Sequence, residues 1–268
     1  MDRSGRELVF QAGLGIRGVT GIQALDGRSL VASLLGMRCF LNHLVTGRSC
    51  KKRTFVLFWP MTKGAQTRET ILDHAIRLAS ETGLEGLTIG TLADDLKLSK
   101  SGLFAHFRSK EALQIQVLEH AAEVFVESVV RPALKAPRGE PRLRVLFEQW
   151  LEWGRATELP GGCIFAAAAS EMDDRPGPVR DRLVELQREW FGVIAISFLK
   201  GVVEGHFRED ADPDQFAQDL YGIMLGFHHA SRLLQDPEAG RRARRAFERL
   251  LVDASPSPRP RPVTPSTS

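Results

Sequence analysis

The 268-residue sequence is poor in the features that mark secreted, metal-binding or membrane proteins. Its three cysteines, Cys39, Cys50 and Cys163, lie far apart without metal-ligand spacing, which indicates free thiols in a reducing compartment. The longest apolar runs, such as "FVLFWPM", are far shorter than the roughly 20 residues that span a bilayer. No signal-peptide pattern opens the chain. We therefore expect a cytoplasmic protein without a metal site or a membrane anchor.

Catalytic motifs are also missing. The sequence has no G-x-S-x-G, H-E-x-x-H, P-loop or Cys/His zinc pattern, so we do not expect an enzyme. One partial match to a dinucleotide fingerprint, "GLGIRG" at Gly13, Gly15 and Gly18, follows a possible strand. Further glycines interrupt the helix that must follow, and no acidic residue lies between Gly27 and Lys63. We expect no cofactor.

The sequence has a net positive charge only in its N-terminal part, and the rest has a small net negative charge. Residues 1–60 hold nine Lys/Arg against three Asp/Glu, whereas the remainder holds 27 against 30. The net charge of +3 is therefore no evidence that the main body binds nucleic acid, and such a function must rest on local geometry. Residues 1–60 lack sustained periodicity, and we expect an unstructured leader or a start site that is really Met61.

Helical periodicity begins at Thr67 and continues to about Leu251. Thr88 and Ser99 or Ser101 can cap two short helices, and Ser109 can cap a long one that we expect to end at Pro132. Further helices open near Pro141, Pro178 and Asp212, a short apolar one lies at 161–174, and the last covers 238–251. The pattern predicts an all-α fold of about nine helices, followed by a flexible Pro/Ser-rich tail.

The stretch "TIGTLADDLKLSKSGLFAHFRSK" (88–110) predicts a helix-turn-helix. We expect Leu92, Leu96, Leu98 and Leu103 to fix the angle between its two short helices. Residues of the second helix would then face a DNA major groove, with small residues allowing close approach. The alternative is an ordinary helical hairpin with solvated polar residues.

The stretch from Thr67 to Val117 resembles the TetR family of bacterial transcriptional repressors. The resemblance is carried by "G-x-x-x-x-T-I-x-x-L-A" at 83–93, "LSKSGLFAHF" at 98–107 and "SKEAL" at 109–113. It implies a DNA-binding domain at 61–110, a helical ligand-binding and dimerisation domain at 111–252, and a tail at 253–268. It further implies a repressor that binds a palindromic operator as a homodimer and is released by a small-molecule effector. The alternative function is an all-helical adaptor or small-molecule-binding protein without DNA binding.

The resemblance assigns DNA contacts residue by residue. Thr88 matches a phosphate-contacting helix start, and the positions expected to contact DNA are Thr88, Ser99, Lys100, Ser101, Gly102, Phe104, Ala105, His106 and Lys110. The family most often has Tyr at the position of Phe104 and frequently at that of Ala105, so two phosphate-contacting hydroxyls are absent. His106 has the alternative of a partly buried helix histidine.

The helical second half holds the expected effector site and dimer interface. Candidate lining residues are Trp150, Trp153, Cys163, Phe165, Met172, Trp190, Phe191, Met224 and His228, each with core packing as the alternative. Cys163 has no flanking cation, so inert burial competes with a thiol sensor. The two last helices, 212–235 and 238–251, would pair across a dimer, where Gly222 and Gly226 permit close approach. "RRARR" at 241–245 is expected to be a solvated face.

Overall fold

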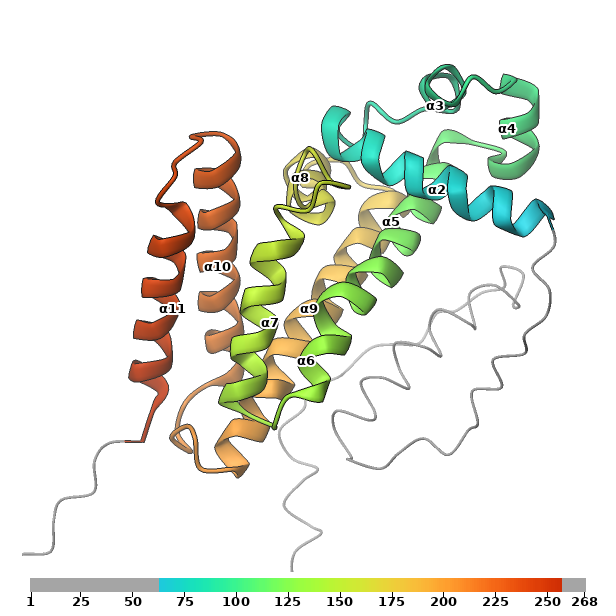
Figure 1. Ribbon diagram of the computed structural model, residues 1–268. Coiled ribbons are helices and arrows are strands. Elements are labelled where there is room, and N and C mark those ends of the chain that lie inside the picture. The colour runs from blue at the N-terminus through green and yellow to red at the C-terminus, as the bar shows by residue number, and fades with distance from the viewer. Residues whose placement is uncertain (1–62, 257–268) are drawn as a thin grey trace, which may run out of the picture. The chain divides into compact units, whose positions relative to one another are not determined.

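The computed structural model describes residues 63–256, and this part of the chain is all-helical (Figure 1). The helices in chain order are α2 (Lys63–Thr82), α3 (Ile89–Leu96), α4 (Lys100–Phe107), α5 (Lys110–Phe125), α6 (Arg131–Lys135), α7 (Glu140–Trp153), α8 (Ile164–Met172), α9 (Pro178–Val203), α10 (Pro213–Arg232) and α11 (Ala239–Ala254). A π-helical turn, Val126–Val130, joins α5 to α6. The predicted all-α class is confirmed for the described residues.

Local signals set the ends of the first helices as expected. Gly83, at a φ of 79°, ends α2, and Thr88 caps α3 by accepting a hydrogen bond from the Thr91 backbone N–H. Ser99 and Ser109 cap α4 and α5 in the same way. Apolar residues of α2–α4 then pack into a small core that includes Ile71, Ala75, Leu87, Leu92, Leu103 and Phe107, each no more than 3% exposed.

The long helix does not end at Pro132, where we expected it to end. It passes through the π-turn and continues as α6 to Lys135. A proline inside a helix lacks the N–H of one hydrogen bond and its ring collides with the carbonyl four residues earlier. The wider turn, in which the Arg131 N–H bonds to the Val126 carbonyl, accommodates Pro132 within a continuous helix.

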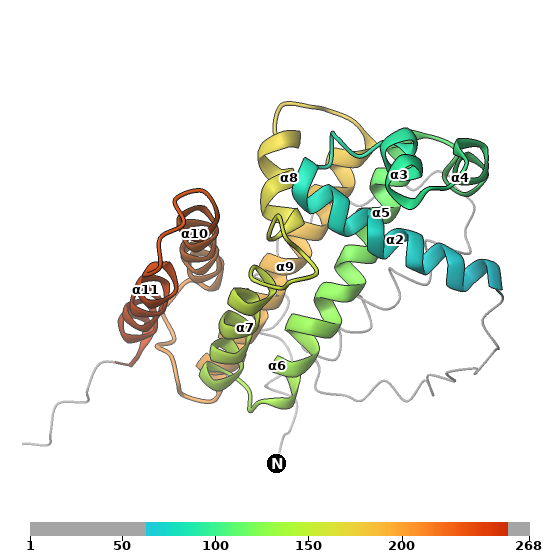
Figure 2. The same ribbon diagram turned by 45° about the horizontal axis from the view of Figure 1, so that its top comes forward.

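Aromatic rings fill the core of the second half. Phe125 lies edge-on to three other rings, with centroid distances of 5.4 Å to Trp153, 5.9 Å to Phe165 and 5.0 Å to Trp190. Nearer the other end of α9, Phe198 stacks on Phe207 and Phe216. Helices α10 and α11 form an antiparallel hairpin that packs beside α7 and α9, as both views show (Figure 2).

Several predictions concern residues beyond this range. The leader (1–60), the "GLGIRG" motif, Cys39 and Cys50 lie outside the described residues, as does the tail after Pro256. The last helix continues to Ala254, three residues past its predicted end, because Leu251 and Ala254 are buried and extend its apolar face. None of the described helices combines the length and apolarity that crossing a bilayer requires.

Candidate functional site

Helices α3 and α4 form a helix-turn-helix held together at its turn. Lys97 takes the left-handed conformation (φ 55°), and the Leu98 N–H bonds to the Ala93 carbonyl, which ends α3. Leu92, Leu103 and Phe107, each at most 1% exposed, join the two helices. Leu98 was expected to share this role but is 46% exposed, because the left-handed residue before it turns the chain outward. Leu96 is half-buried.

The outer face of α4 is open. The residues expected to face DNA from this segment are all exposed, namely Ser99, Lys100, Ser101, Gly102, Phe104, Ala105 and His106. Phe104 is 57% exposed, so it forgoes much of the roughly 1.5–3 kcal/mol that complete burial of such a side chain contributes. The exposure of His106 rules out the partly buried alternative. This face therefore keeps an apolar side chain available for a partner.

Cationic groups surround α4. A Cβ added at Gly90 would lie 3.8 Å from Lys100 Nζ and 3.5 Å from Thr88 Oγ1, so the ammonium group lies beside the N-terminus of α3. Lys110 is half-buried, and its Nζ is bonded to Glu85 at 2.6 Å. Lys97 and Arg108, which we did not predict as site residues, are exposed cations at the ends of α3 and α4. Both residues have positive φ values, which belong to the turns that end the two helices, and the sequence alone does not show that non-glycine residues take this conformation here.

Helix α8 holds the turn between α2 and α3. The Glu171 carboxylate accepts hydrogen bonds from the backbone N–H groups of Leu84 (3.2 Å) and Glu85 (2.9 Å). A Cβ at Gly83 would lie 2.6 Å from Glu171 Oε1, so a larger residue would displace this carboxylate. We refer to these bonds between Glu171 and residues 84–85 as the Glu171 clamp.

Further contacts reinforce this junction. The buried Gln114 donates to the Leu84 carbonyl at 2.6 Å, and the Gly161 N–H donates to Ser80 Oγ at 3.1 Å. Glu85 pairs with Lys110 and with Arg175 at 3.0 Å, and the hydrogen bond from Lys110 is the main reason that its pKa is lowered. The helix-turn-helix is therefore attached to the second half by directional bonds, which fix its orientation relative to α8.

The predicted effector residues do not form one cavity. Met172 and Phe191 line a cavity of about 450 Å³ between α8 and α9, and Trp153 lines another of about 500 Å³ near α2, α5 and α7. Trp150 and Met224 are core residues, at 2% and 0% exposure, and Phe165 and Trp190 pack on Phe125. Cys163 and His228, like these four, line neither cavity.

Burial shifts the pKa of both of these side chains. The Cys163 thiol is buried, and burial raises its pKa, which favours the unreactive protonated form. Burial, helped by Arg232 and His229, lowers the pKa of His228. No cluster of three metal-ligating side chains occurs within residues 63–256.

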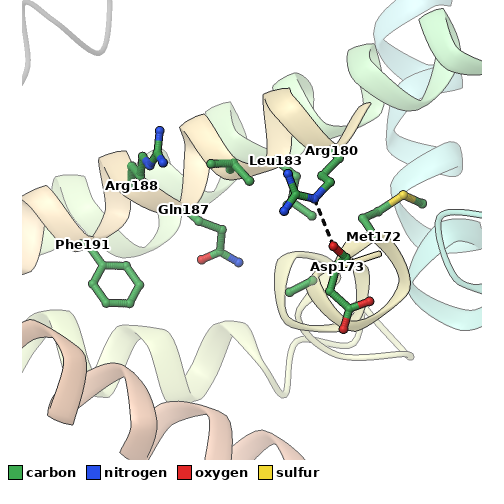
Figure 3. A pocket seen from close by; sticks show the side chains of 9 residues that line it. Met172, Asp173, Arg180, Leu183, Gln187, Arg188 and Phe191 are labelled. Atoms are coloured by element: carbon green, nitrogen blue, oxygen red, sulfur yellow. Dashed lines mark hydrogen bonds between the residues drawn. The ribbon is translucent and has the colours of Figure 1, made fainter. Parts of the chain in front are cut away.

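The cavity between α8 and α9 combines an apolar wall with polar ends (Figure 3). Its lining residues are Ala169, Met172, Asp173, Arg180, Leu183, Val184, Gln187, Arg188 and Phe191. Gln187 donates to the Phe165 carbonyl at 3.2 Å and is hydrogen-bonded to Tyr221, whose pKa burial raises to about 12. We did not predict Gln187 or Tyr221, because their roles depend on the contact of three helices distant in sequence.

The outer face of α10 is unoccupied in the single chain. Positions Gly222 and Gly226 have no atom within 4 Å of an added Cβ, and Leu225 beside them is 38% exposed. Three of the four arginines of "RRARR" are exposed, and ion pairs engage Arg241 with Glu238, Arg242 with Asp236 and Arg244 with Glu148. The prediction that this run is a solvated face is confirmed.

Comparison with known proteins gives matches in both halves. The family model for bacterial regulatory proteins of the tetR family matches residues 71–117, and that for the tetracyclin repressor-like C-terminal domain matches 139–247. The HTH-type transcriptional repressor NemR of Escherichia coli K12 is 27% identical over 165 residues, which cover 60% of this chain and 81% of that protein. The HTH-type transcriptional repressor KstR2 of Mycolicibacterium smegmatis is 23% identical over 66% of this chain and 86% of its own.

Solved structures agree. A TetR transcriptional regulator from Chloroflexus aurantiacus superposes with a TM-score of 0.64 at 25% identity, covering 71% of this chain and 94% of that one. The two family models together span more than half of the chain, and the helix-turn-helix they include has the geometry described above. The chain belongs to the TetR family of bacterial transcriptional regulators.

Proposed function

We propose that this regulator is a repressor that binds a palindromic operator as a homodimer in the cytoplasm and leaves it when a small molecule binds. The names of the relatives NemR and KstR2, both repressors, support the sign of regulation. The observation that carries the DNA-binding role is the open outer face of α4, with its exposed Phe104. TetR regulators are in general non-enzymatic, and the chain lacks the catalytic motifs sought in its sequence.

Each exposed group of the helix-turn-helix has a chemical role in this proposal. Phe104 contacts a thymine methyl group, while Gly102 and Ala105 allow α4 to lie deep in the major groove. Lys100 binds a backbone phosphate together with Thr88, since its ammonium lies beside the N-terminus of α3. Ser99, Ser101 and His106 contact the DNA from the rim. Lys110 must exchange Glu85 for a phosphate, so its contribution to affinity is smaller.

The dimer is proposed to form through α10 and α11. Gly222 and Gly226, one turn apart on an open face, permit another helix to approach closely. Gly226→Leu tests this arrangement without harming the single chain, because the new side chain meets nothing there and leucine favours a helix over glycine. Light scattering should show wild-type dimers and a shift of Gly226→Leu toward monomers, with the helical content in circular dichroism unchanged. A variant that remains fully dimeric would contradict this interface.

The effector is proposed to bind between α8 and α9 and to act on DNA binding through the Glu171 clamp. Ligand and operator would each favour a different arrangement of the junction, so each weakens the other's binding. Met172 and Phe191 are the predicted effector residues that line this cavity.

DNA binding itself is tested by footprinting the full-length chain on the region upstream of its own gene. We expect a protected site with two half-sites about 34–36 Å, or a multiple, apart. Absence of protection throughout that region, with the protein folded and dimeric, would favour the alternative of a helical adaptor.

A further inference from the structure

The α8–α9 cavity follows one continuous stripe of α9. Its lining residues on α9 are Arg180, Leu183, Val184, Gln187, Arg188 and Phe191. Counted from Arg180 they follow at 3, 4, 7, 8 and 11 positions, which is the spacing of one helix face over three turns. The 11 residues between Arg180 and Phe191 correspond to about 16 Å of helix. The cavity therefore extends along α9 and is open to solvent on one side, and its volume of about 450 Å³ falls in the range of small-molecule sites, about 300–1,000 Å³.

The end of the stripe near the start of α9 attracts negative charge. Gly177 precedes α9 and provides no side-chain cap, and Pro178 has no N–H, so the uncapped donors of this end are the N–H groups of Val179 and Arg180, with Asp181 as the one acidic residue of the first turn. Arg180 makes one hydrogen bond, from Nε to the Asp173 carbonyl at 3.2 Å, and neither Arg180 nor Arg188 has an ion-pair partner within residues 63–256. Asp173 is the one acidic lining residue, and its carboxylate points away from the Arg180 guanidinium (Figure 3).

The rest of the stripe is apolar. Leu183, Val184 and Phe191 on α9 face Ala169 and Met172 on α8, and the Phe191 ring lies against Tyr221 at 5.0 Å. Gln187 and Arg188 are the polar lining residues along this part; the Gln187 amide is already engaged with Phe165 and Tyr221, and Arg188 is exposed to solvent. An alkyl or aryl group fits this wall without leaving a polar side chain unpaired.

We propose that this cavity binds an elongated amphipathic anion, with its carboxylate or phosphate on Arg180 and its apolar chain extending toward Phe191. A guanidinium binds either anion through two parallel hydrogen bonds, and the terminal nitrogens of Arg180 are available for them. Arg188, two turns further along α9, is exposed and lies beside the apolar part of the stripe rather than at the head group. The binding of this anion is inferred from the cavity itself, and only its role as the effector rests on the proposed function.

The position of the cavity connects its occupant to the DNA-binding helices. Met172 lines the cavity, and the residue before it, Glu171, holds the turn after α2. Consecutive residues of a helix point about 100° apart, so one helix, α8, contacts the ligand on one side and the DNA-binding domain on another. A ligand that moves α8 therefore acts directly on the Glu171 clamp.

The test uses calorimetric titration of the full-length protein with four probes that share a ten-carbon chain, each below its micellar concentration: decanoate, decyl phosphate, decan-1-ol and decyltrimethylammonium. We expect one or both anions to bind at least tenfold more tightly than the alcohol and the cation, and the comparison of decanoate with decyl phosphate identifies the head group. Absence of binding by both anions, or equal binding of all four probes, would overturn the proposal.

Variants locate the site. Arg180→Gln should weaken anion binding about 10- to 100-fold, as expected for loss of a charged hydrogen-bonding partner, and Arg180→Lys should weaken it less. Val184→Phe fills the cavity and should abolish binding while Arg180 remains. Arg138→Gln, an exposed arginine outside the cavity, is the matched control and should bind like wild type.

Melting curves establish that the variants are folded, and wild-type affinity in both Arg180→Gln and Val184→Phe would overturn the site. Binding of an anion that fails to release operator DNA would support the site and contradict its role as effector site. A protein that binds the operator but neither anion would overturn this inference and leave the proposed DNA-binding function standing.

Discussion

Replacing Glu171 by Gln should loosen the DNA-binding domain from the rest of the chain. The carboxylate accepts two backbone hydrogen bonds, at 3.2 Å and 2.9 Å, from the turn after α2. An amide of the same size retains one acceptor and turns its NH₂ group toward the second donor. One charged hydrogen bond is lost and the other becomes neutral. At about 1.5–3 kcal/mol for each charged bond and about 1 kcal/mol for a neutral one, the cost is about 2–5 kcal/mol.

Two measurements report this loss. For a chain of this size, about 2–4 °C of melting temperature per kcal/mol gives a fall of about 4–20 °C, if the domain and the remainder unfold together. If the junction opens locally, hydrogen exchange at the Leu84 and Glu85 amides should instead accelerate by at least about 30-fold and at most about 5,000-fold, which is the same free energy expressed as an opening equilibrium. Glu209→Gln, an exposed glutamate without an ion pair among the described residues, is the control and should change neither quantity.

The variant also tests the coupling. Because Glu171 lies away from the exposed face of α4, operator affinity without effector should change less than the response of that affinity to effector. The reasoning is refuted if Glu171→Gln melts like wild type and its Leu84 and Glu85 amides exchange at the wild-type rate.

Two further substitutions probe the same junction. Gly161→Ala should destabilise the protein by at least about 1–3 kcal/mol in thermal unfolding, because a Cβ there would lie 1.4 Å from the Ser80 carbonyl oxygen. The control Gly192→Ala, where an added Cβ has nothing within 4 Å, should stabilise the protein by about 0.5–1 kcal/mol. Equal effects of the two substitutions would contradict the close contact at Gly161. His120 bonds to Asp73 at 2.7 Å, and its hydrogen bond to Glu123, followed by that to Asp73, raises its pKa against the effect of burial. Its folded-state pKa therefore exceeds the unfolded value of about 6.5, and the stabilisation is complete below that pH and lost as pH rises through the folded value. His120→Gln should cost about 1 kcal/mol in denaturant unfolding at pH 5.5 and much less at pH 8.5, and a cost independent of pH would contradict this pairing.

The sequence was informative where structure depends on neighbouring residues. Thr88, Ser99, Ser109 and Asp212 each cap the helix expected of them, since a cap needs only the next three residues. It was less informative where distant segments meet. The Glu171 clamp joins Glu171 to two residues that precede it by 87 and 86 positions in the sequence. The α8–α9 cavity depends on how two helices diverge. Apolar periodicity identified Trp150 and Met224 as inward-facing but could not separate core from ligand wall.

Operator affinity of α4 variants tests the central claim most directly. Phe104→Ala and Lys100→Ala should each weaken binding to the footprinted operator by about 1–3 kcal/mol, or about 5- to 150-fold, in fluorescence anisotropy. Lys100→Ala should also reduce the slope of log affinity against log salt by about one, as expected for a phosphate contact, whereas Phe104→Ala should leave it unchanged. Lys135→Ala, an exposed lysine on α6, should bind like wild type. Wild-type affinity and salt dependence in both α4 variants would contradict the assignment of α4 as the DNA-recognition helix.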